Sequence, residues 1–127
     1  GGNQLRPNIH IKDMSNIYLK ILNSDKELVN GEIFNAGYDN FTVNEIAETV
    51  RDIIGHDVEL ERVETNDNRS YHVSSQKIND ILNFKATYTI KDAVNDLKEA
   101  FEKNKLPNSL SDSKYFNIKK MQEINLI

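Results

Sequence analysis

The sequence predicts an α/β fold of about four helices and two or three short strands, because helical and extended patterns alternate along the chain. Apolar residues recur at helical spacing in several segments, and capping residues or glycines stand at their ends. The 127 residues, 38% of them hydrophobic, suffice for one domain with a modest core. We therefore expect a domain over residues 1–103 and a linker and tail over residues 104–127.

The first helix is expected over residues 12–23, where apolar side chains follow the helical period. They are Met14, Ile17, Tyr18, Ile21 and Leu22. Their spacing predicts a single apolar stripe on the helix. Residues 32–35 are then expected to form a short strand, because Gly31 and Gly37 bracket a short apolar run.

A second helix is expected to begin after Thr42, which has Glu45 three residues later in a capping-box pattern. Its apolar stripe is Val43, Ile46, Ala47, Val50, Ile53 and Ile54. Gly55 stands where a left-handed C-terminal cap is expected. Residues 57–61 alternate between acidic and apolar side chains, which predicts a half-buried strand with its carboxylates in solvent.

Two more helices are expected in the second half of the chain. After a short extended stretch at Tyr71 and Val73, Ser74 or Ser75 is expected to cap a helix. Its apolar residues are Ile78, Ile81 and Leu82. Thr89 and Asp92 repeat the capping pattern before the last helix. The apolar stripe there is Ile90, Ala93, Val94, Leu97, Ala100 and Phe101.

Composition excludes several classes of function. The absence of cysteine rules out disulfides, thiolate nucleophiles and thiolate-bound metals, and is compatible with a cytoplasmic protein. No apolar run approaches the roughly 20 residues that span a bilayer. A net charge of -4 argues against non-specific binding to nucleic acid. Any anionic ligand must therefore be held by local arginines.

Arg6 and Arg69 are the candidate binding residues. Arg6 precedes the first helix, and Arg69 follows a polar loop. A guanidinium is planar and permanently charged, and its donors fit phosphate oxygens two at a time. The alternative for Arg6 is a surface arginine that caps a turn. For Arg69, the alternative is an ion pair with Asp67 or Glu64.

The three histidines do not form a catalytic or metal site in the sequence. His10 alternates with Ile9 and Ile11, which favours a structural role over acid–base catalysis. Neither His56 nor His72 has neighbours that complete a ligand set, so we predict no metal.

Five short motifs follow one another over residues 1–101. A Gly-x-Gln-x-Arg-x-x-x-His-Val-x-Asp pattern is matched by Gly2, Gln4, Arg6, His10, Ile11 and Asp13. A Tyr-Asn-Ile-Gly strand end is similar to Phe34, Asn35, Ala36 and Gly37, and a Thr-x-x-Glu helix start is matched by Thr42 and Glu45. An Asp-x-Arg-x-Tyr segment leading to a Lys-Ile helix corresponds to Asp67, Arg69, Tyr71, Lys77 and Ile78. A Thr/Ser-Ile/Leu-x-Asp helix start corresponds to Thr89, Ile90 and Asp92.

In this order the motifs resemble the C-terminal, substrate-binding part of the extended short-chain dehydrogenase/reductases. These are NAD-dependent epimerases and dehydratases that act on nucleotide sugars. The resemblance implies that Arg6 and Arg69 reach the diphosphate or nearby ribose of a nucleotide-sugar substrate. It also implies a reaction at a sugar carbon, which is epimerisation, dehydration or ketone reduction, and a homodimer as the complete enzyme.

The chain differs from this family in the motifs that bind the cofactor and carry out catalysis. The family's Gly-x-x-Gly-x-x-Gly loop is missing, since Gly1, Gly2, Gly31, Gly37 and Gly55 are dispersed. A Tyr-x-x-x-Lys spacing occurs only at Tyr115 and Lys119 in the tail, after every matching motif. We therefore expect no catalytic residue and no bound cofactor in this chain. The resemblance assigns NAD or NADP to an N-terminal Rossmann domain outside it.

Two other classes of function stay open. One is a free-standing module that binds a nucleotide or nucleotide sugar without catalysing a reaction. The other is an interaction module that docks its exposed helix stripes on a partner.

Overall fold

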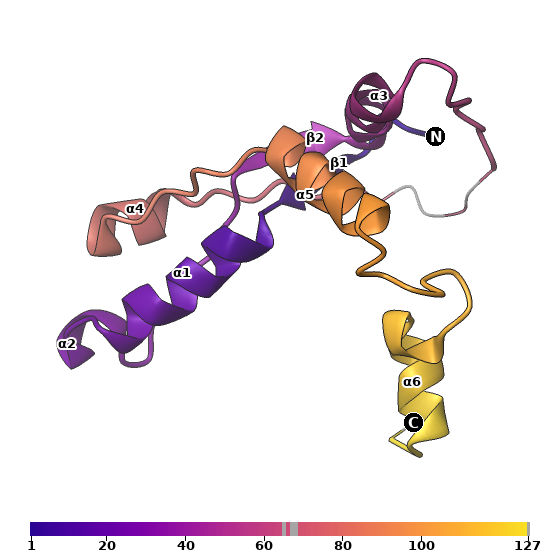
Figure 1. Cartoon of the computed structure of the whole chain (residues 1–127). Coiled ribbons are helices and arrows are strands. Elements are labelled where there is room, and N and C mark those ends of the chain that lie inside the picture. Colours follow the sequence, from indigo (N-terminus) through magenta and orange to yellow (C-terminus); the bar gives the residue numbers. More distant parts are fainter. Residues whose placement is uncertain (65, 67–68, 127) are drawn as a thin grey trace. The chain divides into compact units, whose positions relative to one another are not determined.

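A computed structural model describes the chain apart from residues 65, 67, 68 and 127 (Figure 1). The described residues form an α/β structure of six α-helices, one 3-10 helix and two strands. In chain order these are β1 (Leu5–Asn8), α1 (Ile11–Leu22), α2 (Lys26–Val29), β2 (Asp39–Thr42), α3 (Val43–Ile54), α4 (Gln76–Leu82), α5 (Ile90–Glu102), the 3-10 helix (Ser113–Tyr115) and α6 (Asn117–Glu123). The chain divides into two compact units, Gly1–Asp96 and Leu97–Ile127. The predicted domain boundary after residue 103 stays a prediction.

The sheet consists of β1 and β2 in antiparallel pairing, with Leu5 opposite Thr42 and Pro7 opposite Asn40. The sequence patterns predict neither strand. Pro7 breaks the pattern of β1, and β2 is only four residues long before α3 begins. Beyond β1, the amide of Tyr71 donates to the carbonyl oxygen of Leu5 at 3.1 Å. The stretch expected at Tyr71 and Val73 therefore lies beside this sheet, although it is not itself a strand.

The core of the first unit joins α1 to α4. Ile17 from α1 packs with Ile78 and Leu82 from α4, and all three are buried. Phe34 and Phe84 pack against this cluster. The burial is limited, which agrees with the modest core expected from the composition.

The predicted single stripe of α1 is split between two sides of the helix. Ile17 is buried and Ile21 half-buried, whereas Tyr18 and Leu22 are exposed. Residues 11, 18 and 22 are spaced by seven and four, so they share a face that points away from the core. The helix therefore carries a second apolar face.

The helix predictions are confirmed in position. The predicted helix over residues 12–23 matches α1, and Thr42 and Glu45 form the complete capping box of α3. Helices α4 and α5 begin near the predicted serine and threonine caps. Gly55 ends α3 but is not a left-handed cap, because its φ of 153° is combined with a ψ of 145°.

The two predicted strands are wrong. Residues 32–35 and 57–61 are irregular, and the described residues contain a single ladder, between β1 and β2. A strand needs a neighbour for its peptide groups, and the described residues place none beside these two segments. The segment over residues 32–35 is instead held by Lys77. Its Nζ donates to the carbonyl oxygen of Ile33 at 3.0 Å and pairs with Glu32 at 2.7 Å.

The tail is more regular than the sequence predicts. It contains a 3-10 helix and α6, within the unit Leu97–Ile127. Asp112 caps the 3-10 helix, because its side chain accepts a hydrogen bond from the amide of Lys114 at 3.0 Å. Across the described residues, every helix is too short or too polar to cross a membrane.

Candidate functional site

Gly2 and Gln4 fix the start of the strand that carries Arg6. Gly2 is buried with a φ of 112°, and a Cβ there would collide with the carboxamide of Asn44. The side chain of Gln4 accepts the amide hydrogen of Gly2 at 2.6 Å, while the amide of Asn44 donates to the carbonyl oxygen of Gly2 at 2.9 Å. The glycine at this position is therefore required by space and by backbone conformation.

Arg6 and Arg69 come together around the ring of Tyr71. The Arg6 guanidinium carbon lies 5.6 Å from the centre of this ring, and that of Arg69 lies 5.9 Å from it. Arg6 Nη1 also donates to the carbonyl oxygens of Leu5 and Arg69, at 2.9 and 2.6 Å. Each guanidinium is within the distance of a cation–π contact. The arrangement gathers two permanent positive charges at one edge of the sheet.

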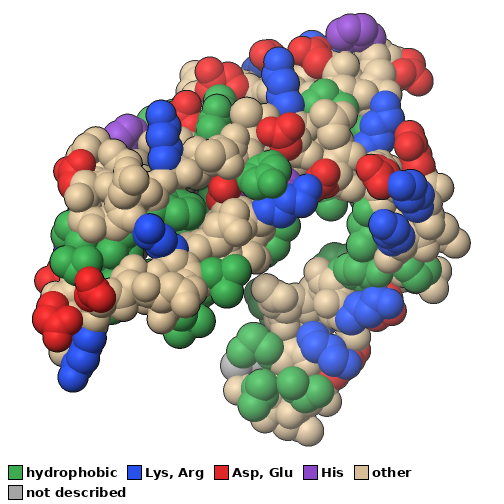
Figure 2. Space-filling model, turned by 60° about the vertical axis from the view of Figure 1, so that its left-hand side comes forward, with side chains coloured by type: hydrophobic (Ala, Val, Ile, Leu, Met, Phe, Trp, Pro, Cys, Tyr) green, Lys and Arg blue, Asp and Glu red, His purple; other side chains and the backbone are tan. Residues whose placement is uncertain are grey.

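Their chemistry suits an anion with several oxygens. Arg6 is half-buried and Arg69 is exposed, so a ligand reaches the pair from solvent. Figure 2 shows acidic and basic side chains interspersed over the visible face of the described residues, without a continuous basic surface there. The arginine pair concentrates positive charge locally at the ring of Tyr71.

The structure bears on the alternative, purely structural roles of these two arginines. Arg6 links β1 to the backbone of residue 69, so it has a structural contact beside any ligand role. The alternative ion pair between Arg69 and Asp67 lies outside the described residues, because Asp67 is not among them. The binding role of both arginines stays a prediction.

His10 is structural, as its neighbours in the sequence predict. It is 5% exposed and caps α1, because its Nδ1 accepts the amide hydrogen of Lys12 at 3.1 Å. Its ring stacks on Tyr88 with centroids 4.9 Å apart, and its Nε2 lies 3.4 Å from a carboxylate oxygen of Asp96. That carboxylate also bonds Lys12 at 2.7 Å, and this hydrogen bond lowers the pKa of Asp96 and raises the pKa of Lys12.

Asp13 has a structural role that the sequence patterns do not reveal. It is 1% exposed, and its Oδ2 accepts hydrogen bonds from the amides of Thr87 at 3.0 Å and Tyr88 at 2.9 Å. A carboxylate one helical turn from Ile17 is the available signal, because that position faces the core. Asp13 thereby ties α1 to the segment that places Tyr88 under His10.

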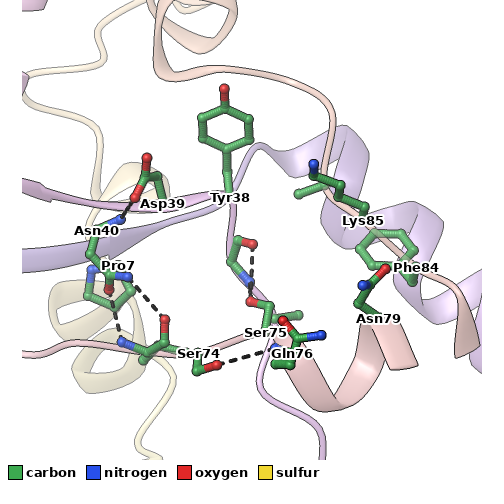
Figure 3. A pocket seen from close by; sticks show the side chains of 14 residues that line it. Pro7, Tyr38, Asp39, Asn40, Ser74, Ser75, Gln76, Asn79, Phe84 and Lys85 are labelled. Carbon is green, nitrogen blue, oxygen red and sulfur yellow. Dashed lines mark hydrogen bonds between the residues drawn. The ribbon is translucent and has the colours of Figure 1, made fainter. Parts of the chain in front are cut away.

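A pocket of about 450 Å³ lies on one side of the sheet, and neither Arg6 nor Arg69 lines it (Figure 3). Pro7 and Asn40 come from the strands, and Asn79, Phe84 and Lys85 lie across from them. No sequence pattern predicts this pocket, because its lining residues come from four separate stretches of the chain. Within the described residues, no group of three or more His, Asp or Glu side chains is arranged to hold a metal.

No protein-family model matches the sequence, and no curated protein matches it either. The fold is similar to the crystal structure of the Bordetella bronchiseptica enzyme WbmF in complex with NAD+ and UDP. The TM-score is 0.66 at 20% sequence identity, over 99% of this chain and 35% of that chain. The chain thus spans about a third of the length of the protein it matches. This likeness confirms the predicted α/β fold, which in WbmF belongs to a longer chain.

Proposed function

We propose that this chain is the substrate-binding, C-terminal part of an NAD- or NADP-dependent enzyme that epimerises, dehydrates or reduces a nucleotide sugar. The observation that carries the proposal is the convergence of Arg6 and Arg69 on Tyr71. The five motifs support it, and so does the similar fold of an enzyme seen with NAD+ and UDP. The complete enzyme is proposed to be a cytoplasmic homodimer.

The role of the arginine pair is to position the substrate. Two forked guanidinium groups hold the diphosphate, which does not react. Binding energy from this non-reacting part fixes the sugar carbon against the nicotinamide, which lowers the entropic part of the barrier. Hydride transfer and proton transfer belong to the Rossmann domain that we propose precedes this chain.

The second apolar face of α1 supports docking on that domain. Ile11 is 72% exposed and Leu22 is 79% exposed, although both are large aliphatic residues on a regular helix. Ile33 is 81% exposed in the segment where the sequence predicts a strand. Exposed apolar surface of this kind marks a site of contact with other protein surface. A sheet in the preceding domain would supply the neighbour that residues 32–35 lack here.

The test is a calorimetric titration of the 127-residue chain with UDP and with uridine. We expect saturable binding of UDP and much weaker binding of uridine, because the diphosphate supplies the charge. Arg6→Ala or Arg69→Ala should weaken UDP binding by about tenfold or more, since a charged hydrogen bond contributes roughly 1.5–3 kcal/mol. Arg62→Ala is the matched control, because Arg62 is an exposed arginine of the same unit that is not one of the two guanidinium groups over Tyr71.

Circular dichroism of each variant checks that the helices are retained. Equal affinity for UDP in the wild type and the double variant would rule out the arginine pair as the diphosphate site.

An interaction module is the second candidate, favoured by the exposed face of α1. In that case UDP does not bind, and the chain associates through this face. Tyr18→Lys would then abolish association measured by sedimentation, while Arg6→Ala would leave it unchanged.

A further inference from the structure

The pocket of about 450 Å³ is lined by neither Arg6 nor Arg69. Pro7 and Asn40 are cross-strand partners, and both line the pocket. Arg6 and its partner Phe41 are the next pair in the ladder. Neither member of this next pair lines the pocket. The pocket is therefore a separate place from the proposed diphosphate site.

One wall of the pocket is held in place by side-chain hydrogen bonds to backbone groups. The carboxamide of Asn40 donates to the carbonyl oxygen of Val73 at 3.0 Å and accepts its amide hydrogen at 2.9 Å. Ser75 Oγ accepts from the amide of Gly37 at 2.8 Å and donates to its carbonyl oxygen at 3.1 Å. Figure 3 shows these bonds among the residues that line the pocket. Four hydrogen bonds thus join two chain segments, which makes this wall preformed.

Other polar groups in the lining are not used by the fold. Among the described residues, the Lys85 ammonium and the Asn79 carboxamide make no hydrogen bond or ion pair. Lys85 is exposed, as is Asn79, so both reach a ligand without rearrangement of the core. The volume falls in the usual range for small-molecule sites, roughly 300–1,000 Å³.

The chemistry of the lining selects a neutral ligand rich in hydroxyl groups. Lys85 contributes a positive charge and Asp39 a negative one, so these two groups give the lining no net charge and favour neither an anion nor a cation. The rings of Tyr38 and Phe84 add flat apolar surface. A ligand that satisfies amide, ammonium and carboxylate groups and also has an apolar face is a pyranose ring.

We propose that this pocket binds a hexopyranose. The sugar has two possible sources, which are a free or glycan-borne saccharide and the glycosyl group of a nucleotide sugar. Only the second source rests on the proposed function. Neither Arg6 nor Arg69 lines the pocket, so the arginine pair is not part of this sugar site.

The test is amide chemical-shift mapping by NMR on the 127-residue chain. Three free sugars are added separately, namely glucose, galactose and N-acetylglucosamine, followed by UDP and the three corresponding UDP-sugars. The variants are Asn79→Ala and Lys85→Ala, which remove the unused polar groups. Their matched controls are Asn95→Ala and Lys91→Ala, which remove the same groups from exposed positions of α5 outside the pocket.

A free sugar is expected to shift the amides of residues 73–75 and the side-chain amide of Asn79. Each pocket variant should weaken this binding by about tenfold, and neither control should change it. Shifts caused by a UDP-sugar, but by neither UDP nor the free sugar, also support the pocket and identify the glycosyl group as its ligand. The proposal is overturned if none of the sugars or UDP-sugars shifts these resonances, or if the pocket variants respond like the wild type. If UDP does not bind, the titrations with free sugars still test the pocket. Failure of the diphosphate site can therefore be distinguished from failure of the sugar site.

Discussion

Arg6 donates a hydrogen bond of 2.6 Å to the carbonyl oxygen of Arg69, which is 63 residues away in the sequence. Both guanidinium groups also lie over the ring of Tyr71. The amide of Tyr71 in turn donates to Leu5, next to Arg6 in β1. Backbone pairing and cation–π contacts therefore place the two arginines together before any ligand is bound.

Tyr71 is expected to be a positioning residue for both arginines. Tyr71→Leu should weaken UDP binding several-fold, because it removes the ring that orients two flexible side chains. Tyr71→Phe keeps the ring and should bind UDP as the wild type does. Calorimetry on the two variants provides the comparison. A loss of affinity in Tyr71→Phe that matched the loss in Tyr71→Leu would instead point to the hydroxyl.

Asp13 is expected to stabilise the first unit more than any exposed carboxylate. Asp13→Ala leaves the amides of Thr87 and Tyr88 without an acceptor and should lower the free energy of unfolding by about 3 kcal/mol. Asp13→Asn retains an oxygen for these amides and should cost clearly less. Urea unfolding followed by circular dichroism measures both values. Equal stability of wild type and Asp13→Ala would contradict this role.

The stability of the chain is expected to depend on the carboxamide of Asn40, even when only its nitrogen is replaced by oxygen. Asn40→Asp keeps an acceptor for the Val73 amide but places a carboxylate oxygen against the Val73 carbonyl oxygen. We expect both Asn40→Asp and Asn40→Ala to destabilise the chain, with Asn40→Ala costing about 2 kcal/mol for two hydrogen bonds. Thermal unfolding gives the order of stability. A variant Asn40→Asp as stable as the wild type would show that the paired geometry is unimportant.

Two capping carboxylates are expected to make stability depend on acid pH. Hydrogen bonds from Thr42 lower the pKa of Glu45 from its usual 4.5, and hydrogen bonds from Thr89 lower the pKa of Asp92 from its usual 3.8. A lowered pKa in the folded state means that the stabilisation is present above the unfolded value. It is lost as the pH falls through the folded value.

The check is urea unfolding of the wild type and of Glu45→Gln and Asp92→Asn between neutral pH and pH 3. Each variant should be less stable than the wild type near neutrality and should lose less stability on acidification. Identical pH profiles for variants and wild type would show that the caps do not couple to folding.

Local signals predicted the helices better than the strands. A capping box places its partners three residues apart, so Thr42 with Glu45 identifies the start of α3 without any distant contact. In contrast, β1 and β2 pair residues more than thirty positions apart, and Pro7 hides the alternation of β1. Periodicity also could not tell which face of α1 would be covered, because Ile17 and Tyr18 are both apolar.

The candidate site likewise combines features that local sequence signals predict with features that depend on tertiary contacts. Arg6 and Arg69 were predicted as binding residues from their chemistry and motifs, while their shared contact with Tyr71 depends on tertiary structure. The pocket beside Asn40 combines residues from four stretches, and no local pattern signals it. Asp13 was part of a motif, but its burial could be seen only once the segment around Thr87 was placed.

The most direct test of the central proposal is to sequence the coding DNA upstream of Gly1. The predicted result is an in-frame extension with a glycine-rich strand-to-helix turn and a Tyr-x-x-x-Lys pair, the parts that bind the dinucleotide and move protons in the resembling family. A start codon at or next to Gly1 would contradict the proposal that this chain completes a nucleotide-sugar enzyme.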